Sequence, residues 1–120
     1  MKRTAFTLIE LLAVLAIISF LVSIVFVNSR LFVDRARDAK VKKQLDALRQ
    51  SVFIFRADHQ GRNPVAPGEL YPAYIREINL TWQGSRGEGL ISYDPAEGEF
   101  LLVLERGESV DNLGMAYAEY

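Results

Sequence analysis

An apolar stretch of 22 residues, from Phe6 to Val27, limits what this chain can fold into. Its only charged side chain is Glu10. As a helix the stretch would be about 33 Å long, at roughly 1.5 Å per residue, which is enough to cross the ~30 Å hydrocarbon core of a bilayer. Lys2 and Arg3 precede it, and basic flanks favour the cytoplasmic side. The stretch therefore predicts one membrane-spanning helix with a cytoplasmic N-terminus.

Glu10 is unusual in such a helix, because a carboxylate inside a membrane costs about 3 kcal/mol on insertion scales. One interpretation places Glu10 near the membrane edge, where it reaches water or is protonated. The other gives it a cationic partner from outside the stretch, which contains no Lys or Arg. Cleavage after Ala5 would create an α-amino group on Phe6, one helical turn before Glu10. That amine could pair with the Glu10 carboxylate of a neighbouring subunit.

The N-terminus resembles the class III signal of the type IV pilin superfamily, since it reads Lys2-Arg3, a small residue, then Phe6-Thr7-Leu8-Ile9-Glu10-Leu11-Leu12. The superfamily includes type IV pilins and the pseudopilins of type II secretion and competence. The resemblance implies cleavage between Ala5 and Phe6 by prepilin peptidase, N-methylation of Phe6, and subunit docking through Phe6, Thr7 and Glu10. The superfamily usually has Gly before the cut, where this chain has Ala5.

The charge distribution and the composition limit the functions that this chain can have. Residues 1–63 carry 11 basic and 5 acidic side chains, net +6, whereas residues 64–120 carry 3 basic and 10 acidic, net −7. A basic stem and an acidic head suit contacts between subunits, although lipid headgroups and solubility explain the same pattern. An acidic head repels phosphates, so we expect no direct nucleic-acid binding by it. The absence of cysteine excludes a disulfide framework.

Residues 30–58 are predicted to continue the helix, because no Gly or Pro occurs between Phe6 and Gln60. Apolar residues at 4-3-4-3 spacing mark one face, which we expect to pack on the chain's own sheet. That stripe is Val41, Leu45, Leu48, Val52 and Phe55, with Ala47 and Ile54 expected to widen it. The charged residues before it are expected either to face solvent or to form ion pairs between subunits: Arg30, Asp34, Arg35, Arg37 and Asp38. Gly61 and Pro64 are stop signals that end the helix near Asp58.

Three strands are predicted after the helix, at residues 79–83, 89–94 and 99–105, and their short links favour an antiparallel meander. The side chains expected to face the helix are Leu80, Trp82, Leu90 or Ile91, Tyr93, Phe100, Leu102 and Leu104. Tyr71, Tyr74, Ile75 and Ile78 are expected to pin the connection to this core. In the tail, Leu113, Met115 and Tyr117 alternate and could add a short edge strand.

No catalytic constellation is apparent, because the chain has one His, no HExxH motif and no phosphate-binding loop. We therefore expect neither an enzyme nor a cofactor. Calcium is the one metal worth weighing, since related pseudopilins bind it in a C-terminal loop. The oxygen ligands available here are Glu108, Asp111 and Asn112, with Asp94 and Glu97 from the preceding turn, and the tail lacks an Asp-x-Asp-x-Asp run.

The sequence thus predicts an α+β fold, in which a long N-terminal helix with a membrane half and an amphipathic half packs on a small antiparallel sheet of three to four strands. The resemblance implies a leader peptide at 1–5, a transmembrane or filament-core helix at 6–27 and an external head at 28–120. It also implies a subunit of a type IV pilus or type II secretion pseudopilus that self-assembles into a helical filament.

The expected partners are prepilin peptidase, an inner-membrane assembly platform and membrane lipid before assembly. The subunit would sit in the inner membrane and then in a periplasmic or extracellular filament. The alternative is a monomeric single-pass membrane protein with a small external binding head.

Overall fold

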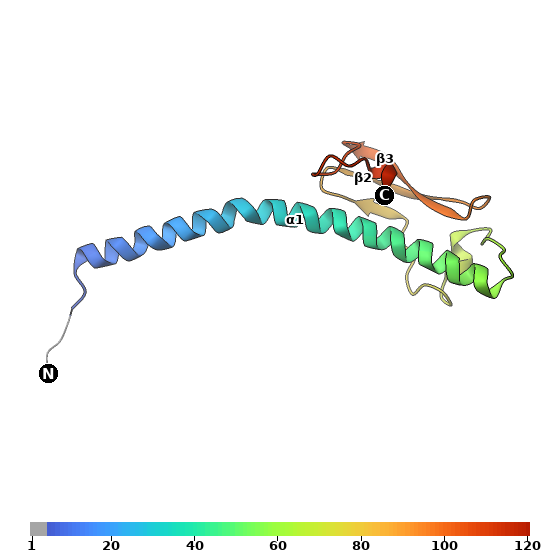
Figure 1. Ribbon diagram of the computed structural model, residues 1–120, viewed down its shortest axis with the longest axis horizontal. Helices are drawn as coiled ribbons and strands as arrows, with labels where there is room; N and C mark the ends of the chain where they lie inside the picture. The colour runs from blue at the N-terminus through green and yellow to red at the C-terminus, as the bar shows by residue number, and fades with distance from the viewer. Residues whose placement is uncertain (1–4) are drawn as a thin grey trace. The chain divides into compact units, whose positions relative to one another are not determined.

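The computed structural model describes residues 5–120 (Figure 1). It contains the helix α1 (Leu8–Asp58), the strands β1 (Thr81–Gln83), β2 (Gly87–Asp94) and β3 (Glu99–Gly107), and two short 3-10 helices, η1 (Pro67–Leu70) and η2 (Tyr117–Glu119). The chain divides into two compact units, one up to Val33 and one from Asp34 to Tyr120. The predicted α+β class, with one long helix and a small antiparallel sheet, is confirmed.

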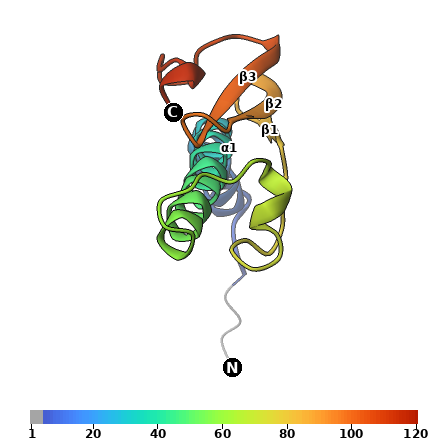
Figure 2. The ribbon, with the colours of Figure 1, turned by 90° about the vertical axis from the view of Figure 1, so that its right-hand side faces the viewer.

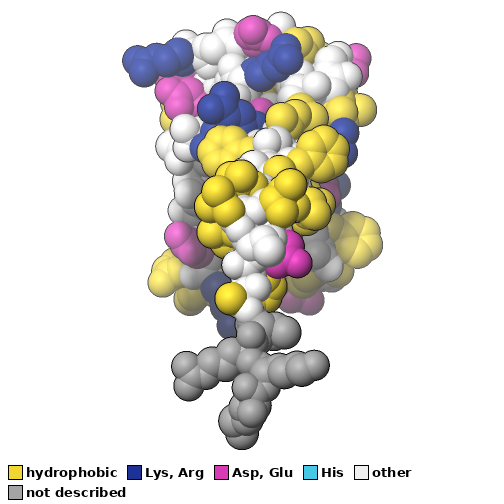
Figure 3. Space-filling view, turned by 90° about the vertical axis from the view of Figure 1, so that its left-hand side faces the viewer, with side chains coloured by type: hydrophobic (Ala, Val, Ile, Leu, Met, Phe, Trp, Pro, Cys, Tyr) yellow, Lys and Arg dark blue, Asp and Glu magenta, His cyan; other side chains and the backbone are white. Residues whose placement is uncertain are grey.

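The first unit is the apolar half of α1, and its side chains are exposed, as the space-filling view shows (Figure 3). Two serines in it bond to their own helix: Ser19 Oγ donates to the Leu15 carbonyl and Ser23 Oγ to the Ser19 carbonyl, each at 2.7 Å. These hydroxyls therefore need no water, which suits a bilayer, where polar groups must be satisfied internally. By length and composition, α1 contains a segment able to cross a membrane.

In the second unit, the predicted apolar stripe of α1 forms the centre of the core. Its five members are all buried: Val41, Leu45, Leu48, Val52 and Phe55. The expectation that Ala47 and Ile54 widen it is wrong, because both are exposed. At 100° per residue these positions lie on the far side of the helix. Ser51 is buried instead, and its hydroxyl donates to the Leu48 carbonyl at 2.6 Å.

The strands form a three-stranded antiparallel sheet in the order β1-β2-β3, and viewed along the helix they lie to one side of α1 (Figure 2). Trp82, Ile91 and Phe100 are buried against the helix, and Leu80, Tyr93 and Leu102 pack partly on this core. Leu90 and Leu104 are exposed, so the expectation for Leu104 is wrong. A shift in register between Glu88 and Gly89 places Leu104 opposite Gly89, which has no side chain to cover it.

The connection and the tail differ from expectation. Leu70 is fully buried, whereas Tyr71, predicted to pin the connection, is exposed. The tail forms no edge strand but a single bridge between Val110 and Ala116, followed by η2. Tyr117 is buried, while Leu113 and Met115 are exposed. The alternation failed as a strand signal because the backbone turns between Asp111 and Met115, where Gly114 has φ of 84° and its N–H donates to the Asp111 carbonyl at 3.1 Å.

Candidate functional site

The start of α1 is closed by a reciprocal pair of hydrogen bonds between Thr7 and Glu10. The Thr7 N–H donates to Glu10 Oε2 at 2.9 Å, and the Glu10 N–H donates to Thr7 Oγ1 at 3.3 Å. The Leu11 N–H also donates to the Thr7 carbonyl at 3.2 Å, so Thr7 is the N-cap residue. This arrangement is a capping box, which satisfies donors that a helix start leaves unpaired. The carboxylate of Glu10 is thereby held in the first turn.

Ala5 and Phe6 lie immediately before this cap, outside the helix and outside any other regular secondary structure, and Phe6 is 88% exposed. A peptide bond that is exposed and outside regular secondary structure is open to a peptidase. The nitrogen of Phe6 is one residue away from the Thr7 N–H that Glu10 accepts. The predicted docking residues Phe6, Thr7 and Glu10 are therefore brought together at one end of the helix. Lys2 and Arg3 lie outside the described residues.

The charged segment predicted to pair between subunits separates into two groups. Arg30, Arg35 and Arg37 are exposed, Asp34 is half-buried, and none of them forms an ion pair among the described residues. Asp38 is only 5% exposed. The expectation of an inter-subunit ion pair at Asp38 is therefore wrong, since its carboxylate is used inside the head.

Asp38 ties α1 to the β1–β2 turn and to the tail. Its Oδ1 accepts the Ser85 N–H at 2.8 Å and the Tyr117 hydroxyl at 3.1 Å, and its Oδ2 accepts the Ser85 hydroxyl at 2.7 Å. The Tyr117 ring packs on Trp82, with centroids 4.6 Å apart. A Cβ on Gly84 would overlap that ring, so this glycine makes room for the tail. A buried carboxylate with three strong donors is a structural anchor.

The end of the tail is held by a second buried carboxylate, Asp111. Its Oδ1 accepts the N–H groups of Leu113 and Met115 at 2.8 and 3.0 Å, and its Oδ2 accepts the Tyr120 hydroxyl at 2.6 Å. Burial raises the pKa of Asp111, but these hydrogen bonds and the charge of Lys42 outweigh it and hold the pKa below the usual 3.8. Arg49 adds a 2.7 Å bond to the Tyr120 carbonyl.

These hydrogen bonds engage some of the oxygen atoms that were considered as calcium ligands. Both carboxylate oxygens of Asp111 are engaged by protein donors, and Glu108 pairs with Arg86 at 3.0 Å. Asp94 accepts the Ala96 N–H within its own turn. Within residues 5–120, no three His, Asp or Glu side chains are grouped as a metal site.

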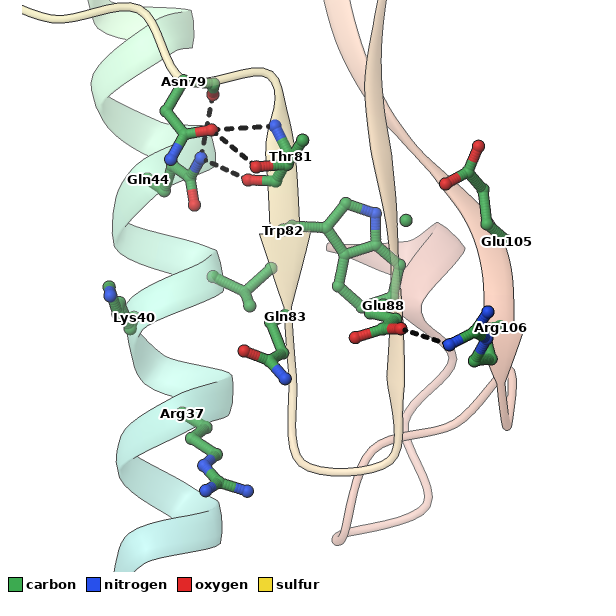
Figure 4. A pocket seen from close by; sticks show the side chains of 12 residues that line it. Arg37, Lys40, Gln44, Asn79, Thr81, Trp82, Gln83, Glu88, Glu105 and Arg106 are labelled. Atoms are coloured by element: carbon green, nitrogen blue, oxygen red, sulfur yellow. Dashed lines mark hydrogen bonds and ion pairs between the residues drawn. The ribbon is translucent and has the colours of Figure 1, made fainter.

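A groove of about 640 Å³ runs between α1 and the sheet at β1 (Figure 4). Val41 and Trp82 line its apolar part, and the helix contributes Arg37, Lys40 and Gln44. On the strand side its charged lining is Glu88, Glu105 and Arg106, with a 3.7 Å ion pair between Glu88 and Arg106. The helix side of the groove is therefore basic, and its strand side carries both signs of charge with more acidic than basic residues.

Gln44 closes the outer edge of β1 in this groove. Its Nε2 donates to the carbonyls of Asn79 and Thr81, at 2.8 and 2.9 Å, and Asn79 Oδ1 accepts the Thr81 N–H at 3.0 Å. An open strand edge invites pairing with another chain. The edge at Thr81 is instead occupied by side chains from the same head.

Two of these arrangements had a signal in the sequence. Thr7 and Glu10 stand three residues apart before an apolar run, which is the pattern of a capping box. Asp38 stands three residues before Val41 and therefore lies on the same helix face as the buried stripe, so the helical periodicity also predicts that Asp38 is buried. The partners of Asp38 had no local signal, since Ser85 and Tyr117 are 47 and 79 residues away along the chain.

Comparison with known proteins adds one finding. Residues 1–26 match the family model of the prokaryotic N-terminal methylation motif. This match confirms the resemblance to the class III signal of type IV pilins, and with the long helix and small antiparallel sheet the chain is pilin-like. Such a motif implies, in general, membrane insertion, processing by prepilin peptidase and filament assembly. No curated protein and no solved structure matches the chain.

Proposed function

We propose that this chain is a structural subunit of a type IV pilus or type II secretion pseudopilus. Prepilin peptidase cuts between Ala5 and Phe6 and methylates the new amine of Phe6. An assembly platform in the inner membrane then moves the subunit out of the bilayer into a filament. The apolar half of α1 packs against the same segment of its neighbours, and the heads form the outside.

The observation that carries this proposal is the position of the Glu10 carboxylate, which lies in the first helical turn and is bonded to the N–H next to Phe6. Because this carboxylate is already held in place, its side chain loses less conformational entropy on binding a cation than a mobile side chain would lose. A methylated amine of a neighbouring subunit is such a cation. In an apolar filament core the pair is poorly screened, so it fixes axial register between subunits.

Variants of Glu10 test the proposal, with filament yield and membrane insertion measured in the same cells. Glu10→Ala and Glu10→Lys are expected to insert normally and to form no filament. Ser19→Ala is the matched control, because it removes a polar group that bonds only to its own helix among the described residues. Normal filament yield from the Glu10 variants would contradict the docking role.

The groove at β1 supports a second candidate, a monomeric membrane protein with an external binding head. A volume of about 640 Å³ lies within the range of ligand pockets. The capping box also gives Glu10 a local role that needs no neighbour. This candidate predicts that the chain keeps Ala5, stays in the membrane as a monomer, and captures ligand less well or differently when Lys40→Glu changes the charge of the groove.

A further inference from the structure

One short motif in the head has no role in the functions proposed above. It reads Asn79-Leu80-Thr81, which is the pattern Asn-x-Thr with a residue other than proline in the middle. This pattern is the acceptor signal for N-glycosylation of exported proteins. None of the chain's other asparagines has a Ser or Thr two residues later. Because so short a pattern also occurs by chance, its geometry in the head matters.

The motif lies on the surface, where an enzyme can reach it. Asn79 and Thr81 are both exposed, and residues 77–80 lie outside regular secondary structure, directly before β1. Modified and cleaved residues are found mainly in such exposed connecting segments, because the local chain can adapt to an enzyme without unfolding the core. The buried neighbour Trp82 holds the following strand in place.

The two polar side chains of the motif are bonded to each other. Asn79 Oδ1 accepts the Thr81 N–H at 3.0 Å and the Thr81 hydroxyl at 2.7 Å (Figure 4). Both bonds use the amide oxygen, and Asn79 Nδ2 forms no hydrogen bond within residues 5–120. N-glycosylation attaches the sugar to this nitrogen and leaves the oxygen as an acceptor. The folded head can therefore carry a sugar at Asn79 and keep both bonds.

Asn79 also stands beside an open edge of the sheet. In the order β1-β2-β3, β1 is an edge strand. The Ile91 N–H donates to the Leu80 carbonyl at 2.7 Å, so Thr81, one residue later, turns its own N–H and carbonyl away from β2. Exposed strand edges invite pairing with other chains. A bulky, solvated sugar at Asn79 would hinder such pairing at the place where β1 begins.

We propose that Asn79 is an N-glycosylation site, and that its sugar comes from a saccharide carried on a lipid pyrophosphate. The amide nitrogen attacks the anomeric carbon of the first sugar and forms a C–N bond. The bond between that carbon and the phosphate oxygen breaks, the lipid pyrophosphate leaves with the electron pair, and the nitrogen gives up one proton. The inference rests on export of the head, which both functions proposed above share, and not on filament formation.

Mass spectrometry of the protein recovered from its native membrane or filament tests this site. Trypsin cuts after Arg76 and Arg86, so the motif falls in one peptide of residues 77–86. This peptide is expected to carry a saccharide, and fragmentation that leaves the sugar attached is expected to locate it on Asn79. Recovery of the peptide in its unmodified mass alone, or with the sugar on Thr81, would overturn the proposal.

Two changes at Thr81 form a matched pair, because they alter the hydroxyl group and leave Asn79 in place. Thr81→Ser keeps the acceptor pattern and should keep the modification. Thr81→Val has a similar shape without the hydroxyl and should lose the modification completely. The fluorescence of the buried Trp82 shows whether each variant is folded. Equal modification of the two variants would contradict the proposal.

Asn79→Asp removes the nucleophile while keeping the fold. Its carboxylate oxygens can still accept the N–H and hydroxyl of Thr81, but it has no amide nitrogen. This variant should have native Trp82 fluorescence and no saccharide on residues 77–86. A saccharide that persists on this peptide would place the modification elsewhere and overturn the assignment to Asn79.

The outcomes separate this site from the filament function, because filament yield is measured on the same samples. Filaments built from unmodified chains would overturn the site and leave the function standing. A modified Asn79 in chains that form no filament would support the site while contradicting the filament function.

Discussion

The Thr7 N–H donates to Glu10 Oε2 at 2.9 Å, so one side chain both caps the helix and presents its charge beside Phe6. These two roles make different demands on residue 10. Capping needs an oxygen acceptor at this position, which Glu and Gln both provide. Docking on an amine needs the negative charge.

Glu10→Gln is therefore expected to keep the cap and lose the docking. Filament yield should fall to the level of Glu10→Ala, while amide exchange of Glu10 and Leu11 in detergent micelles stays at the wild-type rate. Wild-type filament yield from Glu10→Gln would mean that the acceptor, not the charge, is what assembly uses.

Thr7→Val is the complementary change, since it removes the hydroxyl that accepts the Glu10 N–H. Losing an N-cap hydroxyl costs about 1 kcal/mol, so amide exchange in the first turn should be about fivefold faster. Assembly should continue, because the carboxylate remains. A loss of filaments as complete as in Glu10→Gln would show that the two roles are not separable.

Asp38→Ala is expected to destabilise the head by about 2 to 3 kcal/mol, because Ser85 and Tyr117 would lose their acceptor in a buried site. Trp82 is the single tryptophan and is 3% exposed, so its fluorescence reports denaturant unfolding of the full-length chain in micelles. Asp34→Ala, one turn earlier and less buried, is the control and should change stability by about 0.5 kcal/mol or less. Equal losses from the two variants would contradict the anchoring role of Asp38.

The pair formed by Asp111 and Tyr120 predicts how head stability depends on pH. The pKa of Asp111 is lowered in the folded head, so its contribution is complete above about pH 3.8 and is lost as the pH falls through the lower folded value. Burial, the hydrogen bond to Asp111 and the charge of Asp38 raise the pKa of Tyr120 above its usual 10.0. That contribution is complete below pH 10 and is lost as the pH rises further.

Tyr120→Phe removes this pair, so its stability deficit relative to wild type should be constant between about pH 4 and 10 and should shrink outside that range. The measurement is urea unfolding at a series of pH values with Trp82 fluorescence. A deficit that does not change with pH would mean that the Tyr120 ring, and not its hydrogen bond, supplies the stability.

Gly89→Ala should be among the most damaging single methyl additions in the head. The added Cβ would overlap the Val103 carbonyl across the bulge between β2 and β3. Forcing these strands apart is expected to cost about 2 kcal/mol or more. Gly68→Ala is the control, since its Cβ meets nothing within 4 Å. The same fluorescence assay should show little change for Gly68→Ala and a clear loss for Gly89→Ala.

Local periodicity was sufficient to predict much of this fold. The 4-3-4-3 spacing identified the buried stripe. The helix ends at Asp58 as predicted, but two residues after it are left-handed, Gln60 with φ of 56° as well as Gly61 with φ of 83°, and the Gly61 N–H donates to the Arg56 carbonyl at 2.8 Å. The strands were found within two residues of their bounds because short apolar runs were separated by turns. The error at Ile54 came from counting neighbours of the stripe as part of it, although the helix turns them away from the core.

The sequence pattern could not predict contacts between residues that are far apart along the chain. Nothing near Asp38 shows that Ser85 and Tyr117 will bond to it, and nothing near Tyr117 shows that Gly84 leaves room for its ring. Each of these contacts forms only when the whole head has folded. The same limit applies to the site. The spacing of Thr7 and Glu10 predicts their mutual hydrogen bonds, but it does not show which group of a neighbouring subunit would bind Glu10.

The most direct test of the filament account is the intact mass and N-terminal residue of the protein recovered from its native membrane or filament. The account predicts a mature chain that begins at Phe6 and carries one added methyl group on its α-amine. A chain that keeps Ala5 in front of Phe6, without the methyl group, in cells with active prepilin peptidase, would contradict it and leave the membrane-anchored binding protein as the better description.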